Sequence, residues 1–329
     1  MQDIQKQLDS LIKTGFDAVE IPEEPSGLYN PVRYTLEMGG KRLRPKLVLL
    51  TAGLCGTDPS KALPPAIAVE MLHNFTLVHD DIMDHAETRR GMATVHRKWD
   101  QSSAILSGDV LFVLAMKQLV AFDRPGPESD RLKAELTRRF LDAVQTVCDG
   151  QALDMAFQKR DRVSVQEYLQ MIRAKTAALI QCSMQMGAMV AGSDAKTIKD
   201  CGEIGHHAGL AFQIQDDLLD ATGDSETFGK KVGGDIVEGK KTCLSILALE
   251  RADDVDRKLL KQLYGNKTAD EGDILRVIRI YHDLGVIDEA IALITEHYNI
   301  ASQKLEEFEN SAYRREINML LDKLKVRNN

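Results

Sequence analysis

The sequence lacks the marks of a secreted, disulfide-bonded or zinc-binding protein. Its five cysteines are odd in number and scattered, and no two of them stand in a CxxC spacing. This pattern argues against a disulfide framework and a thiolate zinc site, and it favours a reducing compartment. The segment from Met1 to Phe16 is polar and charged and has no apolar block of the signal-peptide kind. We therefore expect a cytoplasmic protein.

Three further absences narrow the class. Runs of alternating β-branched residues are nearly missing, so a large sheet is not expected. Lysine and arginine total 42 against 50 acidic residues, and the net charge of −8 argues against a nucleic-acid partner or a basic membrane-surface protein. The longest uncharged stretch, Thr176 to Ser193, contains Gln181, Ser183 and Gln185, which are costly in hydrocarbon. It predicts a buried helix and no stable membrane insertion.

What the sequence does have is helical periodicity. Apolar residues recur at three- and four-residue spacing in four long segments, which we predict to be helices: 130–160, 165–191, 195–220 and 287–309. A glycine- and lysine-rich break from Thr222 to Lys241 is unusually long for a loop in a compact domain, which is typical of a functional or a disordered segment. No repeat or composition shift marks a border. The chain is therefore predicted to be all-α, with one domain over residues 1–329.

The sharpest motif is a repeated aspartate cluster. Asp80-Asp81-Ile82-Met83-Asp84 and Asp216-Asp217-Leu218-Leu219-Asp220 both follow apolar helical runs. Residues four apart lie on one helix face, so like charges repel there unless a cation is bound. Carboxylate oxygens are the ligands that Mg²⁺ prefers, often together with substrate phosphates. The two clusters predict a paired metal site.

Basic residues accompany each aspartate cluster. Gly39-Gly40-Lys41-Arg42-Leu43-Arg44-Pro45 precedes a helical run, where cations beside a helix N-terminus oppose its dipole. A bound anion removes that conflict, because the free N–H groups and the cations then point at the same charge. Arg89-Arg90-Gly91 follows the first cluster, and the lysines of 229–241 follow the second. Together these groups predict a Mg²⁺–diphosphate site.

In these motifs the chain resembles the trans-isoprenyl diphosphate synthases, the polyprenyl synthetase family, and in particular short-chain members of the farnesyl and geranylgeranyl type. The resemblance rests on Gly39–Pro45, Glu70–Gly91, Lys175-Thr176 and Phe212–Thr242. It implies a helical bundle around a deep central cavity, usually a homodimer. It also implies head-to-tail condensation of isopentenyl diphosphate with an allylic diphosphate, by ionisation, condensation and elimination.

The resemblance also implies roles for single residues. Asp80, Asp84 and Asp216 would hold three Mg²⁺ ions that bridge the allylic diphosphate. The other positions carried over would contact the allylic diphosphate (Arg89, Lys175, Lys230, with Lys240 nearby), bind isopentenyl diphosphate (Lys41, Arg44, His73, Arg90), or face the developing carbocation with their oxygens (Thr176, Gln213). For His79 we expect a core histidine that a backbone carbonyl satisfies.

Product length follows from the residues before the first aspartate cluster. In this family, bulky residues there block the growing chain, and Phe75 lies five residues before Asp80 while Thr76 lies four before. One aromatic floor residue without a second resembles the geranylgeranyl pattern. We expect a C20 product, with C15 as the nearest competitor, and side chains around Leu72, Met116 and Leu119 could change the outcome.

Three other interpretations remain open at this stage. Glu70-x-x-His73 and Glu203-x-x-His206 match the ligand pattern of a di-iron carboxylate bundle, but that class leaves the glycine–lysine loop and both aspartate clusters without a purpose. A class I terpene cyclase shares the first cluster and Mg²⁺, but it normally carries a different second motif. A non-catalytic subunit of a heteromeric synthase typically loses one cluster, and both are intact here.

Overall fold

The computed structural model describes residues 2–124, 126–223 and 232–323, and they group into two compact units. Unit 1 consists of Met1–Val144, Cys182–Gly202 and Phe308–Ile317. Unit 2 consists of Gln145–Gln181, Glu203–Glu307 and Asn318–Asn329. The chain passes from one unit to the other within four helices, α7 (Ser129–Gln158), α9 (Ala178–Val190), α10 (Ala195–Thr222) and α17 (Ala312–Asp322), and again between Glu307 and Phe308. Each unit is described by itself.

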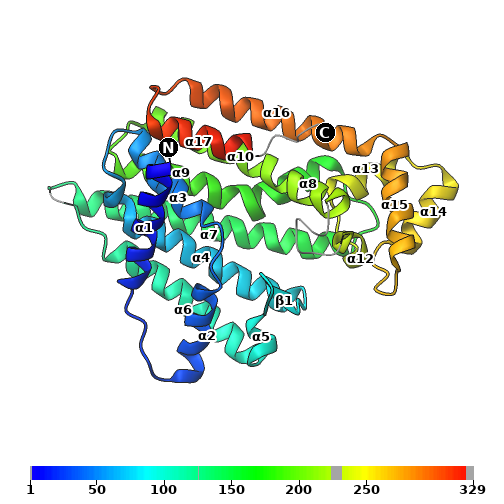
Figure 1. Cartoon of the computed structure of the whole chain (residues 1–329), viewed down its shortest axis with the longest axis horizontal. Coiled ribbons are helices and arrows are strands. Elements are labelled where there is room, and N and C mark those ends of the chain that lie inside the picture. Colours follow the sequence, from blue (N-terminus) through cyan, green and yellow to red (C-terminus); the bar gives the residue numbers. More distant parts are fainter. Residues whose placement is uncertain (1, 125, 224–231, 324–329) are drawn as a thin grey trace. The chain divides into compact units, whose positions relative to one another are not determined.

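Unit 1 is built from the helices of the first part of the chain (Figure 1). Its elements are α1 (Gln2–Asp17), α2 (Ser26–Glu37), α3 (Leu43–Leu54), η1 (Pro59–Ala62), α4 (Leu63–Met83), β1 (Thr88–Arg89), β2 (Met92–Ala93), α5 (Val95–Lys98), α6 (Gln101–Val120) and the first half of α7 (Ser129–Gln158). The C-terminal part of α9, the start of α10 and the start of α17 complete this unit. Helix α4 packs along α6 and contacts α1, α2 and α3 as well. It is therefore the central helix of this unit.

The central position of α4 follows from its sequence. From Pro65 to Leu72 every residue is buried, including Glu70, so the helix is surrounded by protein on all sides over two turns. Two prolines lie at its N-terminus, where a missing N–H costs no hydrogen bond. Towards its C-terminal end polar residues replace apolar ones, and α4 ends at Met83, within the first aspartate cluster.

Unit 2 contains the second half of α7 and the helices of the C-terminal part of the chain (Figure 1). Its further elements are α8 (Val165–Ile172), the π-helical turn η2 (Arg173–Ala177), part of α9 (Ala178–Val190), most of α10 (Ala195–Thr222), α12 (Gly234–Glu238), α13 (Cys243–Arg251), α14 (Asp254–Leu263), α15 (Glu271–Asp283), α16 (Val286–Glu306) and the end of α17 (Ala312–Asp322). A capping box, in which Ser164 and Glu167 satisfy each other's backbone N–H groups, starts α8.

The four helices predicted from periodicity are confirmed within a few residues. The segment 165–191 is interrupted by the π-helical turn η2, which periodicity does not reveal. The uncharged stretch from Thr176 onward is buried, as expected. The fold is all-α: the two-residue strands β1 and β2 form a small hairpin, and no other strand occurs among the residues that the structure describes.

Helix α6 has a composition that the sequence analysis did not single out. By length and composition alone it could cross a membrane. No other helix within residues 2–124, 126–223 and 232–323 is both long and apolar enough to do so. One of its faces packs along α4, with Ala104, Leu111 and Ala115 buried. The other face exposes Leu106, which is 55% exposed.

Candidate active site

Both aspartate clusters lie at helix C-termini. Asp80 lies in the last turn of α4 and Asp84 caps that helix, while Asp216 lies two turns before the end of α10. The C-terminal end of a helix carries partial negative charge, so each carboxylate there costs about 0.3–1 kcal/mol rather than stabilising the helix. A divalent cation reverses this cost. The donor set, carboxylate oxygens alone, fits Mg²⁺.

The middle aspartate of the first cluster has a different role from its neighbours. Asp81 is buried, and its Oδ1 accepts hydrogen bonds from Arg89 Nε at 2.8 Å and Arg89 Nη2 at 2.5 Å. Burial raises the pKa of Asp81, although Arg89 opposes that shift. The same pair raises the pKa of Arg89, although burial acts to lower it. Asp81 therefore anchors the hairpin that carries Arg89 and Arg90.

The turn before α3 has the unusual backbone that its glycines predict. Gly39 and Gly40 have φ values of 70° and 130°, and Arg42 follows in the left-handed region with φ 49°. Among the described residues, Arg42, His85 and Arg90 are the positive-φ residues other than glycine. Strained backbone of this kind costs about 1–3 kcal/mol and gathers at functional sites. Two of these three residues belong to the basic motifs.

Arg42 and Arg44 have different partners. Arg42 pairs with buried Glu70 at 2.8 Å and also donates to the Leu36 carbonyl, so its charge is used inside the protein. Arg44 Nη1 lies 3.2 Å from His73 Nε2. Because a guanidinium can only donate, His73 Nε2 accepts this bond and Nδ1 carries the hydrogen. Burial, and then the charges of four arginines beginning with Arg44, lower the pKa of His73 well below its ordinary value.

The Arg44 guanidinium is incompletely satisfied. Its Nε is buried and has no hydrogen-bond partner in the protein. Burial lowers the pKa of Arg44, an effect that Glu70 opposes and Arg90 reinforces. A half-buried cation with a buried, unpaired N–H and further arginines around it is costly unless an anion compensates it. This part of unit 1 is therefore suited to bind an anion.

Arg90 joins the hairpin to the glycine turn. Its Nη1 donates to the Gly39 carbonyl, and a Cβ on Gly40 would lie 2.6 Å from Arg90 Cζ. Arg90 and Gly91 form a two-residue hairpin turn with φ values of 54° and 76°, the signature of a type I′ turn. Four positions predicted to bind isopentenyl diphosphate thus belong to one neighbourhood of unit 1: exposed Lys41 on the turn, Arg44, His73 and Arg90.

Unit 2 holds the two predicted oxygen donors in a hydrogen-bond chain. Thr176 Oγ1 donates to Gln213 Oε1 at 2.7 Å, and Gln213 Nε2 donates to Asp217 Oδ1 at 2.8 Å. The Tyr168 hydroxyl donates to the other oxygen of Asp217 at 2.6 Å. These hydrogen bonds fix the orientation of the Gln213 amide. They leave the lone pairs of Thr176 Oγ1 for another partner.

Three carboxylates, Asp217, Asp220 and Asp235, lie at the Asp217 end of this series of hydrogen bonds. Burial raises the pKa of Asp217 to about 7, and burial followed by the charge of Asp217 raises the pKa of Asp235 well above its ordinary value. Asp220 accepts hydrogen bonds from the backbone, with Gly233 N 2.7 Å from its carbonyl oxygen and Asp235 N 2.9 Å from Oδ2. Asp220 thus holds the start of α12.

The two predicted lysines of unit 2 that the structure describes have acidic partners. Lys175 lies in the π-helical turn η2 and pairs with Asp154 at 2.5 Å. Gly150 allows this turn to approach α7, because a Cβ there would lie 2.2 Å from the Lys175 backbone N. Lys240 pairs with Glu238 at 2.9 Å. Lys230 lies outside the described residues.

The sequence analysis missed the buried residues that support the predicted ones. Tyr168 and Asp154 lie in ordinary helical sequence, and no local signal marks them. Asp235 could have been noticed in Gly233-Gly234-Asp235, where glycines before an acidic residue indicate a tight turn with a carboxylate. The backbone carbonyl expected for His79 is confirmed, because its Nε2 lies 3.1 Å from the Ile105 carbonyl oxygen, but the side chain is half-buried rather than in the core.

The di-iron interpretation does not fit this arrangement. Glu70 pairs with Arg42 and His73 with Arg44, while Glu203 pairs with Lys304 at 2.5 Å. Within the described part of the chain, no three His, Cys, Asp or Glu side chains are grouped so that they could hold a metal ion. A metal at either aspartate cluster must therefore take further ligands from substrate or water.

Comparison with known proteins identifies the family of this chain. Residues 25–281 match the polyprenyl synthetase family. A short chain isoprenyl diphosphate synthase of Methanothermobacter thermautotrophicus is 40% identical over 91% of this chain and 90% of its own. A geranylgeranyl pyrophosphate synthase of Geoglobus acetivorans is 39% identical over 98% of both chains. The crystal structure of geranylgeranyl pyrophosphate synthetase from Pyrococcus horikoshii has a TM-score of 0.91 and 36% identity, covering 99% of this chain and 98% of that one.

The all-α fold and the acidic and basic clusters define a prenyltransferase that works on diphosphates. The chain belongs to the polyprenyl synthetase family, and its relatives place it among the short-chain trans-prenyl diphosphate synthases. Members of this family generally depend on Mg²⁺.

Proposed function

We propose that this chain makes geranylgeranyl diphosphate by adding isopentenyl diphosphate, head to tail, to allylic diphosphates. The observation that carries the proposal is the half-buried guanidinium of Arg44, whose buried Nε has no hydrogen-bond partner, beside a histidine that stays neutral. Such a group calls for an anionic ligand. We assign the diphosphate of isopentenyl diphosphate to it, bound by Lys41, Arg44, His73 and Arg90. Both units then act as one prenyltransferase domain over residues 1–329.

Each residue of this anion site has a task that follows from its protonation. Arg44 and Arg90 keep their charge and donate N–H groups to phosphate oxygens. His73 is neutral with hydrogen on Nδ1, so it offers an N–H donor without adding charge to an already cationic site. Exposed Lys41 supplies a flexible point charge on the turn before α3.

The allylic substrate engages the acidic residues. Asp80, Asp84 and Asp216 would hold Mg²⁺, which when bound neutralises the departing diphosphate and so favours ionisation of the allylic C–O bond. We propose three ions. Lys175, Lys230 and Lys240 would contact the same diphosphate, together with Arg89, whose Nε and Nη2 are engaged by Asp81.

The protein stabilises positive charge on the allylic carbons with oxygens rather than with a base. Thr176 Oγ1 donates its hydrogen to Gln213, so its lone pairs can face a cation. The amide oxygen of Gln213 adds a second partial negative charge. The double bond of isopentenyl diphosphate attacks the cation, and the proton lost afterwards goes to the released diphosphate. No protein base is then required.

A product analysis tests the proposal. Purified protein is incubated with labelled isopentenyl diphosphate, Mg²⁺ and each of the C5, C10 and C15 allylic diphosphates, and the dephosphorylated alcohols are separated by length. The expected result is a main C20 alcohol that EDTA abolishes. A main C15 or C25 alcohol would contradict the assigned length, and cyclised hydrocarbons would favour the terpene cyclase.

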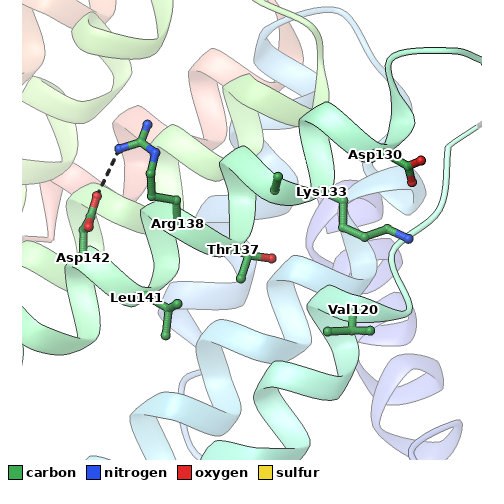
Figure 2. A pocket seen from close by; sticks show the side chains of 8 residues that line it. Val120, Asp130, Lys133, Thr137, Arg138, Leu141 and Asp142 are labelled. Carbon is green, nitrogen blue, oxygen red and sulfur yellow. Dashed lines mark hydrogen bonds and ion pairs between the residues drawn. The ribbon is translucent and has the colours of Figure 1, made fainter.

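We propose that the protein acts as a homodimer through α6. Leu106, Val113 and Val120 are 55%, 49% and 63% exposed and stand seven residues apart, so they form one apolar stripe. The stripe leads into a surface groove where Val120 of α6 faces Thr137 and Leu141 of α7 (Figure 2). A second copy of the same chain would cover a self-complementary stripe of this kind.

Light scattering after size-exclusion chromatography checks the dimer. Val113→Glu places a charge in the stripe and is expected to give a monomer, while Leu275→Glu, at a 58% exposed position on α15, should leave the mass unchanged. A Val113→Glu protein with the wild-type dimer mass would refute this interface. We also propose a cytoplasmic location, which the five free cysteines support.

A further inference from the structure

The proposed product-length residue Phe75 is part of an aromatic group between α4 and α6. Its ring centroid lies 4.7 Å from that of His79, with the ring planes at 59°, and 6.0 Å from that of Phe112. Phe75 and His79 are four residues apart on α4, so their side chains share a helix face. The position of the Phe75 ring thus depends on the position of the His79 ring.

The His79 ring is held by the backbone of α6. Its Nε2 lies 3.1 Å from the Ile105 carbonyl oxygen and 3.9 Å from Asp109 Oδ1. Because a carbonyl oxygen only accepts, Nε2 carries the hydrogen and donates it. Ile105, Gly108, Asp109 and Phe112 are spaced as i, i+3, i+4 and i+7, so one face of α6 receives the ring.

Gly108 makes this contact possible. A Cβ on Gly108 would lie 2.3 Å from His79 Nε2 and 2.5 Å from His79 Cδ2, so any side chain there would displace the ring. Gly108 is buried within a helix, where glycine carries an entropic cost relative to alanine. A helical glycine that bears this cost is explained by the histidine packed on it.

We propose that His79, packed on Gly108, is a positioning residue that holds the Phe75 ring and thereby sets the length of the prenyl product. This inference rests on the proposed synthase function. His79 touches Phe75 rather than the reacting atoms, so it acts on where elongation stops and not on the chemical step. Without the His79 ring, Phe75 can rotate into the vacated space, and the growing chain extends further.

Product analysis of matched variants tests the proposal, with far-UV circular dichroism and a thermal melt for each protein. His79→Ala removes the ring, and His79→Phe keeps an aromatic ring in its place. Gly108→Ala displaces the ring from α6. His282→Ala is the matched histidine control, because His282 lies in α15 of unit 2, away from this group.

The expected result is a shift in length with turnover retained. His79→Ala lengthens the main product by at least one C5 unit, Gly108→Ala changes the product distribution, and His79→Phe and His282→Ala keep the wild-type main product. If His79 acts through Phe75, the double variant Phe75→Ala/His79→Ala gives the same products as Phe75→Ala alone, because the two changes affect one interaction.

The outcomes separate the two proposals. Folded, active His79→Ala and Gly108→Ala proteins with the wild-type product distribution would overturn the role of His79. Additive lengthening in the double variant would also overturn it, because His79 would then act independently of Phe75. If His79→Ala does not fold, the products of Gly108→Ala and His79→Phe test the role of His79 in its place. Failure of the wild-type protein to elongate any primer would instead refute the synthase function, and with it this inference.

Discussion

The guanidinium of Arg90 lies against the backbone of Gly40. Arg90 donates to the Gly39 carbonyl, and a Cβ on Gly40 would lie 2.6 Å from Arg90 Cζ. Two motifs fifty residues apart in the sequence therefore lie together, and glycine suits position 40 for two reasons: its φ is 130°, and the guanidinium occupies the space that a side chain would take. The glycine of the first motif is explained by the arginine of the second.

Gly40→Ala should weaken binding of isopentenyl diphosphate selectively. The added methyl group displaces Arg90, so we expect the KM for isopentenyl diphosphate to rise about tenfold, equivalent to ~1.4 kcal/mol, with little change for the allylic substrate. Steady-state kinetics with each substrate varied in turn measures this. Gly56→Ala is the matched control, because Gly56 also has positive φ but nothing lies within 4 Å of its Cβ position. Equal effects of the two changes would point to backbone strain alone.

Asp80→Asn and Asp216→Asn should each abolish most of the turnover. Each change removes a carboxylate charge proposed to bind Mg²⁺, and the loss is expected to reach about two orders of magnitude or more in kcat. Titration of activity with Mg²⁺ should also show a higher half-saturating concentration. Asp288→Asn, at an exposed position on α16, serves as control. Near-normal turnover of either aspartate variant would remove that residue from the metal site.

Tyr168→Phe should destabilise unit 2 without removing a ligand contact. It deletes the hydroxyl that donates to buried Asp217 and leaves that carboxylate with one donor fewer. We expect the free energy of unfolding to fall by about 1–3 kcal/mol, as is usual for a buried polar group that loses its partner. Urea denaturation measures the change, with Tyr29→Phe as control. If Tyr168→Phe unfolds at the same urea concentration as the wild type, the hydrogen bond from Tyr168 to Asp217 does not stabilise the protein.

Acid should destabilise the protein through His206. Burial, and then the charges of His207 and Arg173, lower the pKa of His206 from 6.5 to about 4. The folded state resists protonation, so the stability held above pH 6.5 is lost as the pH falls from 6.5 towards 4. Because the ring is partly exposed, solvent screening reduces this effect. We expect the free energy of unfolding to fall by on the order of 1–2 kcal/mol over this pH range.

His206→Gln removes this titration. Its unfolding free energy should vary less between pH 6.5 and 4 than that of the wild type, whereas His282→Gln should retain the wild-type pH profile. The comparison is made by urea denaturation at a series of pH values. A His206→Gln profile parallel to that of the wild type would show that other groups cause the acid sensitivity.

Much of this protein could be inferred from the sequence because helices and charged motifs are local. Helical periodicity depends on residues three and four apart, and it predicted the long helices to within a few residues. The aspartate clusters were visible because carboxylates four residues apart on one helix face need a cation. The Gly39–Pro45 segment was visible because cations at a helix N-terminus need an anion.

Only the tertiary structure decided which charges remain available for a ligand. The family resemblance points to Arg44 rather than Arg42, but the physical reason appears only in the structure, where Glu70 pairs with Arg42 while the buried Nε of Arg44 has no partner. Tyr168 and Gly108 carry no local signal, because their roles depend on Asp217 and His79, which are distant in sequence. Pairing and packing between such residues depend on how the helices assemble, which periodicity along the chain does not specify.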